Sequence, residues 1–436
     1  MSATNLWTYN CLDCVTTAKV YLALLEEMQE NEVVKFYDEL VQPLIVSVME
    51  MMKRGMWVDQ QKLEDMKRDY AERINSCTAD LRSIVGDSNF NPASNDHLRK
   101  VLFEDRGMVS TRETATGKES VDELTIKRLA RKYDDPIFEK LLAYRNATKI
   151  NGTYLTNIFI GKGGRVRSRF LVHGTATGRL SSRGPNFQNI PYEVRQIFCA
   201  PPGYVLVEAD ASQLELRLIA YASNCRRLME AFANGEDVHL INASAITGKP
   251  IDSINKEERD FAKRFVYCQN YGGSPRRISE ILFQDAGIVR SIAECEGFVT
   301  RLRIAYPEIY SWRDAEFIKA KRTHKIRNEF GRVRVTFARN DDLAGVAYNT
   351  PIQSTAADYV NYAFIRLSQR GIQIVNKFHD SIVAEAHEEN INEVAAAMKE
   401  EMEKPITVFG HTITIPCDVK VGKSWGSEMV EWHPSA

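Results

Sequence analysis

Apolar residues recur at helical spacing through the first third of the chain, and we expect this whole third to be helical. They predict three helices, over residues 12–28, 33–53 and 59–85. The second ends at Gly55, and the third has a broad charged face, so we expect it to project from the body of the protein. Shorter helices are expected after the polar break at residues 86–89 and up to about residue 155.

The pattern changes after Gly161-Lys162-Gly163-Gly164, where strand signals begin. Alternation at residues 166–170 and the apolar run at 203–207 predict strands. Further along, the pattern predicts a helical block at 214–323, a strand at 332–337, a helix at 346–370 and strands at 373–378, 381–385 and 412–415 around one more helix. Strands from distant parts of the chain would then build one sheet with the helical block inserted between them, which is an α+β fold.

Composition fits a folded protein that works inside a cell. Apolar residues make up 44% and charged residues 26%, and the 57 basic and 58 acidic residues nearly cancel, so any nucleic-acid-binding surface depends on local segregation of charge. We find neither a signal-peptide pattern nor a run of about 18 apolar residues, and we expect no membrane contact. The eight scattered cysteines fit a reducing compartment, the cytoplasm of a bacterium or of a virus-infected host, with an organelle as the open alternative.

Two aspartates stand at the ends of predicted strands. Asp210 follows the apolar strand at 204–207, and Asp380 lies at the tip of the hairpin between Phe378 and Ile382. Carboxylates at the rim of a sheet are suited to bind metal ions. Taken singly, each is more often a turn or cap residue.

A third segment adds phosphate-binding chemistry. Asn255 and Glu258 form a predicted capping box, and Gly272-Gly273 would stop the helix. Within it, every fourth residue falls on one face: Arg259, Lys263, Tyr267 and Tyr271. Two cations followed by two aromatics suit a triphosphate at one end and a base at the other, although a solvated cation pair beside core tyrosines is the simpler reading of this helix alone.

Together these segments resemble family A (Pol I-type) DNA polymerases. Motifs A, B and C of that family are matched, in order, by Asp210-Ala211-Ser212-Gln213-Leu214-Glu215-Leu216-Arg217, the helix at 259–272, and His379-Asp380. Further matches are Thr175-Ala176-Thr177-Gly178-Arg179-Leu180-Ser181-Ser182, Pro185-Asn186-Phe187-Gln188-Asn189-Ile190-Pro191, Asp237-Val238-His239 and Pro351-Ile352-Gln353-Ser354-Thr355-Ala356-Ala357-Asp358. Several ordered motifs are a far stronger signal than any single short pattern.

The resemblance implies a right-hand polymerase fold, with an antiparallel palm sheet, helical fingers and a helical thumb. The expected division is an exonuclease-domain remnant at 1–32, a palm entry helix at 33–57, the thumb at 58–160, palm at 161–221, fingers at 222–340 and palm again at 341–436. The implied partners are primer–template DNA and dNTPs, and the implied activity is extension of a primer 3′-hydroxyl by two-metal phosphoryl transfer.

The same resemblance assigns roles at the reaction centre. Asp210, Asp380 and the backbone carbonyl of Ala211 would hold two Mg²⁺ ions, with Mn²⁺ as a substitute. Lys263 is the candidate general acid for pyrophosphate. The expected nucleotide-binding residues are Arg259, Lys263, Tyr267, Tyr271, Glu215, Gln213 and His239, and the expected DNA-binding residues are Arg179, Asn186, Gln188, Gln353 and His379.

Two of these positions predict selectivity. Glu215 matches the residue that blocks a ribose 2′-hydroxyl, so deoxynucleotides should be preferred. Tyr267 stands where many relatives have phenylalanine. Its hydroxyl would supply a hydrogen bond otherwise made by the nucleotide's 3′-hydroxyl, so dideoxynucleotides should be accepted.

The N-terminus resembles the end of a 3′–5′ exonuclease domain, with Tyr9 and Asp13 matching that domain's last motif. A single aspartate cannot hold a metal pair, so this chain is not expected to proofread alone. Either the sequence is a fragment, or a separate exonuclease subunit docks here. A monomer is otherwise expected. The alternatives to a DNA polymerase are a single-subunit RNA polymerase, which Glu215 disfavours, and a catalytically inactive DNA-binding accessory subunit, which the intact aspartates and cations disfavour.

Overall fold

The computed structural model describes residues 3–434, and the side chains of residues 5–284, 287–339 and 342–434. Helices and antiparallel strands are mixed along the chain, which confirms the α+β class. Within the described residues, no helix is long and apolar enough to cross a membrane.

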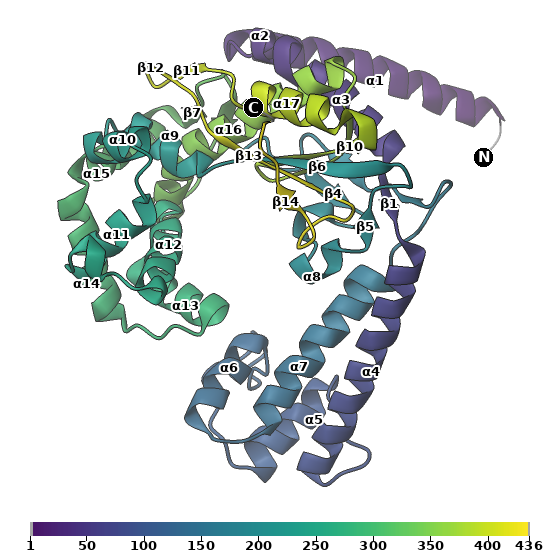
Figure 1. Cartoon of the computed structure of the whole chain (residues 1–436), viewed down its shortest axis with the longest axis vertical. Helices are drawn as coiled ribbons and strands as arrows, with labels where there is room; N and C mark the ends of the chain where they lie inside the picture. Colours follow the sequence, from purple (N-terminus) through teal and green to yellow (C-terminus); the bar gives the residue numbers. More distant parts are fainter. Residues whose placement is uncertain (1–2, 435–436) are drawn as a thin grey trace.

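A five-stranded antiparallel sheet forms the centre of the molecule (Figure 1). Its strand order is β14 (Val430–Glu431), β13 (Cys417–Gly422), β6 (Tyr204–Ala211), β10 (Ser381–His387) and β9 (Gln373–Phe378). β6 thus lies between two strands that come from the far end of the chain. As predicted, segments distant in sequence share one sheet.

Helices that surround this sheet share its hydrophobic core. α17 (Ile391–Met402) packs against β6, while α16 (Asn340–Gln369) packs against α17, α9 (Leu214–Ala222) and α3 (Gln42–Arg54). Trp425, Tyr359 and Phe364 are among the largest fully buried side chains there. A smaller sheet of β2 (Arg165–Val166), β1 (Met56–Val58) and β5 (Phe198–Cys199) lies beside it, and α8 (Tyr192–Arg195) precedes β5.

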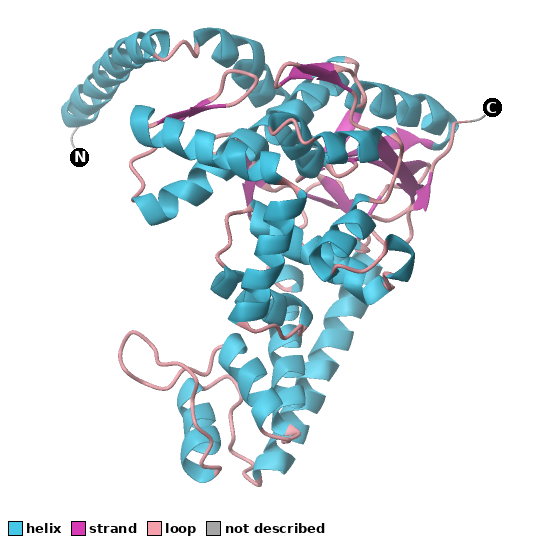
Figure 2. Ribbon diagram, turned by 90° about the vertical axis from the view of Figure 1, so that its left-hand side faces the viewer, coloured by secondary structure: helices cyan, strands magenta, loops and turns pink. Residues whose placement is uncertain are grey.

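The predicted charged helix is α4 (Gln60–Val85), capped by Asp59 and ended by Gly86 in the left-handed conformation. It pairs with α7 (Ile137–Lys149), and both extend away from the sheet, as Figures 1 and 2 show. α5 (Asn95–Arg99) and α6 (Glu123–Lys132) complete this unit, which has its own apolar core around Leu81, Phe90 and Leu129. The projection expected from the broad polar face is confirmed.

A second helical unit follows β6. Its helices are α10 (Arg226–Ala233), α11 (Val238–Thr247), α12 (Lys256–Asn270), α13 (Pro275–Ala286), α14 (Ile292–Ala305) and α15 (Pro307–Thr323). The capping box of Asn255 and Glu258 is present, as predicted from their spacing. Lys127 Nζ donates a 2.8 Å hydrogen bond to the carbonyl of Gln284, so α6 touches the end of α13.

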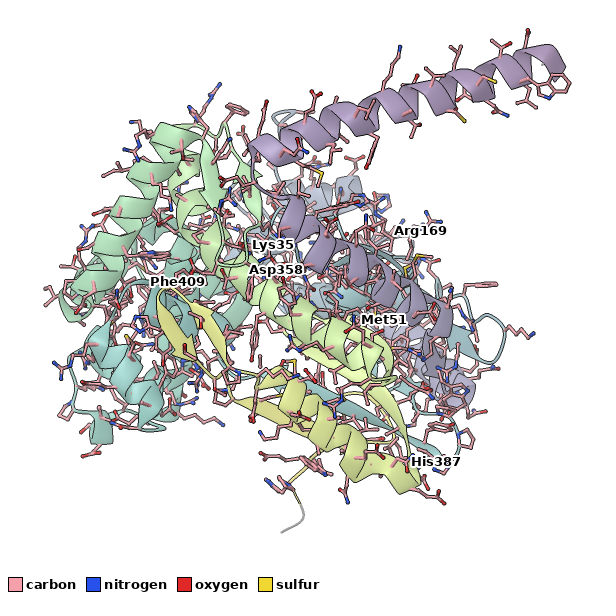
Figure 3. The ribbon with its side chains drawn as sticks, turned by 90° about the horizontal axis from the view of Figure 1, so that it is seen from above. Lys35, Met51, Arg169, Asp358, His387 and Phe409 are labelled. Atoms are coloured by element: carbon pink, nitrogen blue, oxygen red, sulfur yellow. The ribbon has the colours of Figure 1, made fainter. Side chains whose placement is uncertain are left out.

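The first helix, α1 (Ala3–Glu30), extends away from the body (Figure 3). It carries exposed large apolar residues along its length, including Trp7, Leu12 and Tyr21. Its apolar residues are spread around the helix, a pattern typical of a helix that packs inside a folded body.

Several element boundaries differ from the sequence expectation. β6 continues through Ala211, so Asp210 lies within the strand and not after it. The first third is not entirely helical, because β1 pairs with β2 and β5. β12 (His411–Ile413) pairs with β11 (Ile406–Val408) outside the central sheet, and α16 begins at Asn340, six residues earlier than expected.

The remaining short elements connect these layers. They are α2 (Val34–Phe36), β3 (Arg169–Leu171), β4 (Ser181–Arg183), β7 (Lys325–Arg327) and β8 (Val333–Val335), the π-helical turns η1 (Tyr37–Val41), η2 (Lys100–Asp105) and η3 (Ile150–Leu155), and the 3₁₀ turns η4 (Phe187–Asn189), η5 (Ile251–Ser253) and η6 (Glu388–Asn390). The predicted helix at 33–53 therefore contains a π-helical turn, which apolar spacing does not reveal.

Candidate active site

A cleft of about 560 Å³ lies where β6, the β9–β10 turn and α12 meet. Eleven residues that the sequence singles out line it: Arg179, Asp210, Ala211, Gln213, Glu215, His239, Lys263, Tyr267, Tyr271, His379 and Asp380. They come from five separate stretches of the chain, and the fold brings them to one place.

Asp210 and Asp380 lie on neighbouring parts of the sheet. Ser381, the first residue of β10, is paired with Asp210 on β6, and the amide of Ala211 donates a 3.2 Å hydrogen bond to the carbonyl of Asp380. The Asp380 carboxylate is about three-quarters buried, and its Oδ1 is 3.6 Å from Arg179 Nη2. Two carboxylates thus share the floor of the cleft.

The environment of Asp210 disfavours its charged form. The side chain opens to the cleft, yet the surrounding protein removes enough water to raise its pKa, and the negative charges of Asp380, Glu208 and Asp418 add to this effect, giving a pKa of about 7. A bound cation would relieve this repulsion.

Glu215 is held on both carboxylate oxygens. Arg179 forms an ion pair with Oε1, and the Tyr271 hydroxyl donates a 2.6 Å hydrogen bond to Oε2. Burial raises the pKa of Glu215, and the positive charge of Arg179 opposes that rise. The side chain, at 10% exposure, is therefore fixed in the wall of the cleft.

The cationic face of α12 lies beside α11. Arg259 Nε is 2.7 Å from Asp237 Oδ2, and Asp237 also caps α11 by accepting hydrogen bonds from two backbone amides. Burial lowers the pKa of His239, and the nearby charges of Lys263 and Arg259 lower it further. His239 therefore favours its neutral form next to two cations.

Some of the predicted site residues do not line this cleft. Arg259 points to Asp237, and Asn186, Gln188 and Gln353 lie outside the set of lining residues. Tyr9 and Asp13 are exposed on α1, and the structure places neither at the cleft. The expected exonuclease remnant and the active-site cleft are thus separate features of the chain.

Asp418 is a lining residue that the sequence analysis missed. It stands opposite Asp210 on β13, and its charge contributes to the raised pKa of Asp210. The alternation of apolar and charged residues from Cys417 to Lys420 was the available signal, because it is typical of a strand with one face in solvent. The two paired strands, β13 and β6, are separated by about half the chain, so no pattern near Asp418 predicts that they pair.

The cleft has the chemistry that Mg²⁺ prefers. Asp380 Oδ1 and Gln213 Oε1 are buried and, among the described residues, accept no hydrogen bond. Carboxylate oxygens with room for water and phosphate suit this ion, which seldom takes an all-protein cage. Accordingly, the described residues contain no group of three or more His, Cys, Asp or Glu side chains arranged around one metal position.

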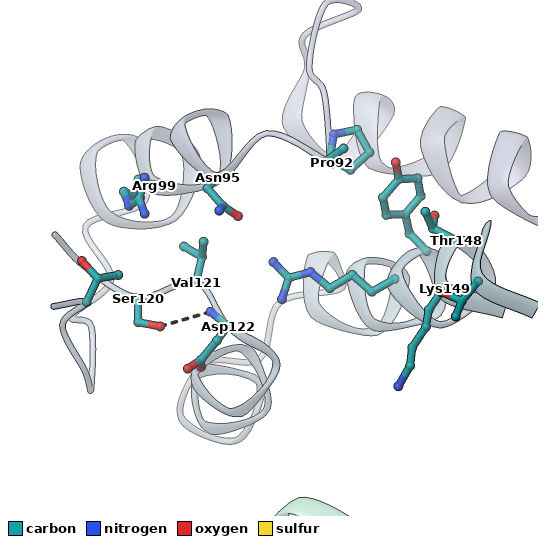
Figure 4. A pocket seen from close by; sticks show the side chains of 13 residues that line it. Pro92, Asn95, Arg99, Ser120, Val121, Asp122, Thr148 and Lys149 are labelled. Atoms are coloured by element: carbon teal, nitrogen blue, oxygen red, sulfur yellow. Dashed lines mark hydrogen bonds between the residues drawn. The ribbon is translucent and has the colours of Figure 1, made fainter. Parts of the chain in front are cut away.

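A second cavity, of about 650 Å³, lies in the α4–α7 unit (Figure 4). Arg99, Arg145 and Lys149 supply positive charge there, and Asn95, Ser120 and Thr148 supply neutral polar groups. Asp122 is the acidic residue of the lining, and its amide donates a 3.2 Å hydrogen bond to Ser120 Oγ. Burial lowers the pKa of Arg145, and its guanidinium remains charged at neutral pH.

Comparison with known proteins agrees with this geometry. The chain is 31% identical over 418 residues to thermostable DNA polymerase I of Thermus aquaticus, covering 91% of this chain and 49% of that protein. It is 30% identical over 440 residues to DNA polymerase I of Treponema pallidum, covering 96% of this chain and 43% of that protein. The chain thus spans about half the length of the curated relatives it matches.

A solved structure, the POL domain of Pol1 from M. smegmatis in complex with DNA primer–template and dNTP, superposes with a TM-score of 0.83 at 27% identity, covering 92% of this chain and 73% of that one. This match confirms the right-hand polymerase fold expected from the motifs, while the exact domain boundaries stay a prediction. The profile of DNA polymerase family A matches residues 60–427. The chain therefore belongs to DNA polymerase family A.

Proposed function

We propose that this chain is a template-directed DNA polymerase that adds dNTPs to the 3′-hydroxyl of a primer. The observation that carries the proposal is that Asp210 and Asp380 lie side by side in a cleft that Lys263 and Tyr267 of α12 also line. The Pol1 domain with the same fold was solved with primer–template DNA and dNTP, which supports the same substrates here.

Asp210 and Asp380, with the carbonyl of Ala211, would hold two Mg²⁺ ions, and Mn²⁺ would serve as a substitute. When bound, such ions supply Lewis-acid stabilisation of the charge that develops in phosphoryl transfer. The raised pKa of Asp210 supports this assignment, since a cation would stabilise the carboxylate that its neighbours disfavour.

The remaining lining residues would bind and orient the nucleotide. Lys263 would contact the triphosphate and donate a proton from Nζ to the leaving pyrophosphate. Arg259 and His239 would hold the outer phosphates, and Arg259 must then exchange its contact with Asp237 for phosphate. Tyr271 would stack at the templating position, and Gln213 would contact the nucleotide from the start of α9.

Primer–template DNA would lie between the two helical units. Arg179 and His379 line the cleft and would face the minor groove of the newest base pairs, together with Asn186 and Gln353. The basic cavity of the α4–α7 unit would contact duplex phosphates, an interaction that is independent of sequence and weakens with salt. This unit would be the thumb, and α10–α15 the fingers.

The test is primer extension by wild type, Asp210→Asn and Asp380→Asn, with Asp252→Asn, an exposed aspartate of η5, as the matched control. Each cleft variant should lose several kcal/mol of transition-state stabilisation, about 10²-fold or more in rate, while binding to primer–template is retained. Extension of rNTPs in preference to dNTPs would support an RNA polymerase instead. DNA binding without extension by wild type would support an accessory subunit.

We also propose that the chain works as a cytoplasmic monomer except where α1 binds a 3′–5′ exonuclease. Among the described residues, no group of metal-binding side chains surrounds Asp13, so such an exonuclease must bring its own carboxylates. Light scattering tests whether the chain is a monomer.

The exonuclease partner is tested by mixing the chain with a co-encoded nuclease and measuring the shortening of a mismatched primer, for wild type and for Asp13→Asn. If the mixture shortens the primer no faster than the nuclease alone, the proposed partner is contradicted.

A further inference from the structure

The turn that carries Asp380 is very short and has unusual backbone geometry. β9 ends at Phe378 and β10 begins at Ser381, so His379 and Asp380 alone make the connection. His379 has a φ of +51°, a left-handed backbone conformation that residues other than glycine seldom adopt. Such a conformation persists only where the surroundings hold it in place.

The side chain of Gln188 supplies much of that support. Its Nε2 donates a 2.6 Å hydrogen bond to the carbonyl of Lys377, and its Oε1 accepts a 3.3 Å hydrogen bond from the amide of His379. One amide group thus bridges the backbone on both sides of Phe378. Lys377, which is only 2% exposed, directs its Nζ to the carbonyl of His379 at 3.4 Å.

Gln188 is itself held firmly. Its backbone amide donates to Asn186 Oδ1 at 3.1 Å and to Ser182 Oγ at 3.2 Å, at the start of the 3₁₀ turn η4. The neighbouring Phe187 is 1% exposed and packs against other aromatic rings. Because its backbone is fixed and its side chain makes two hydrogen bonds to the turn, Gln188 holds the turn in place.

We propose that Gln188 is a positioning residue for Asp380, and that its main effect is on the cation site and not on DNA affinity. This inference rests on the proposed function, because it assumes that Asp380 holds a divalent cation. It departs from the sequence expectation, in which Gln188 reads the minor groove. Removal of a side chain that orients a metal-binding group typically lowers metal affinity or activity by about 10- to 100-fold.

The test compares wild type with Gln188→Ala and Gln188→Glu. The glutamate is nearly isosteric and keeps an acceptor for the His379 amide, but places a carboxylate oxygen against the Lys377 carbonyl. The matched control is Gln353→Ala, which removes another predicted minor-groove glutamine that, among the described residues, makes no hydrogen bond to the turn. Binding of primer–template is measured by fluorescence anisotropy without metal. Mn²⁺ affinity is measured by electron paramagnetic resonance on enzyme held with a dideoxy-terminated primer–template and the next dNTP.

Both Gln188 variants should bind DNA within about twofold of wild type and Mn²⁺ about tenfold or more weakly, and should need proportionately more Mg²⁺ for primer extension. Gln353→Ala should weaken DNA binding and leave Mn²⁺ affinity unchanged. Weaker DNA binding by Gln188→Ala with normal Mn²⁺ affinity would overturn the proposal, as would unchanged values or an equal loss of both. Failure of wild type to extend a primer would instead refute the proposed function.

Discussion

The hydroxyl of Tyr271 donates a hydrogen bond of 2.6 Å to Oε2 of Glu215, and so connects the end of α12 to the first turn of α9. Because Arg179 pairs with the other oxygen, the carboxylate cannot turn away from the cleft without losing both partners. A side chain held in this way is a rigid obstacle, which is what discrimination by steric exclusion requires.

Glu215→Ala should therefore admit ribonucleotides. We expect the ratio of dNTP to rNTP incorporation efficiency to fall by about tenfold or more, in the range that a small change of pocket volume produces. Single-nucleotide extension with each nucleotide type measures the ratio. Glu393→Ala, which removes an exposed glutamate of α17, is the control and should leave it unchanged. An unchanged ratio for Glu215→Ala would show that another group excludes the 2′-hydroxyl.

Tyr267→Phe should make the enzyme reject dideoxynucleotides more strongly. Tyr267 lines the cleft, and burial raises the pKa of its hydroxyl, so this group stays protonated and can donate a hydrogen bond. Loss of one such bond is worth about 1 kcal/mol, or about fivefold in the ratio of ddNTP to dNTP efficiency. Competitive incorporation of the two nucleotides measures it. Efficiency with dNTPs alone should stay near wild type, and equal ratios for both enzymes would contradict the prediction.

Local sequence patterns were sufficient for some of these features and not for others. The capping box of Asn255 and Glu258 and the spacing of Lys263 and Tyr267 lie within one helix, so neighbouring residues determine them. The convergence of Asp210 and Asp380 was expected because their segments resemble motifs A and C, and not from the strand pattern of either segment alone. Strand pairing over long range is different, since β13 brings Asp418 to Asp210 without any nearby signal.

Side-chain hydrogen bonds to a distant backbone are equally hard to predict. Gln188 was assigned to DNA because its motif resembles a DNA-binding one, and the sequence contains nothing that points to the carbonyl of Lys377. Likewise, the π-helical turn at Tyr37–Val41 leaves no trace in the apolar spacing. The sequence thus predicts which residues gather at the cleft better than it predicts how each is held.

Extension at low Mg²⁺ should fall as the pH drops through 7. The pKa of Asp210 is raised to about 7, first by loss of water around it and then by Asp380, Glu208 and Asp418. Below that pH the proton competes with the cation for the carboxylate. Asp418→Asn removes one negative charge and should shift the midpoint of the pH profile to lower pH. Pre-steady-state extension across pH measures this. If the midpoint changes neither with the Mg²⁺ concentration nor with the Asp418 substitution, the pH profile reflects the titration of a group other than Asp210.

The packing of α17 on α16 should depend for its stability on Glu401, whose side chain is only 3% exposed and is surrounded by Arg366, Arg370 and Lys404. Burial alone would raise its pKa, but hydrogen bonds from these three cations outweigh that effect and lower it to about 2. Since the pKa of the unfolded chain is higher, near 4.5, the charged form stabilises the fold above that pH, and the contribution is lost as pH falls from 4.5 toward 2.

Glu401→Gln should accordingly lower the free energy of unfolding by about 3 kcal/mol at pH 7, and the difference from wild type should shrink as the pH approaches 2. Urea unfolding at several pH values measures the difference. Glu400→Gln is the matched control, because the side chain of Glu400 is 61% exposed where it pairs with Arg370, and its loss should change stability by less than about 1 kcal/mol. A Glu401→Gln difference that stays constant with pH would mean that lost packing, and not the carboxylate charge, accounts for the destabilisation.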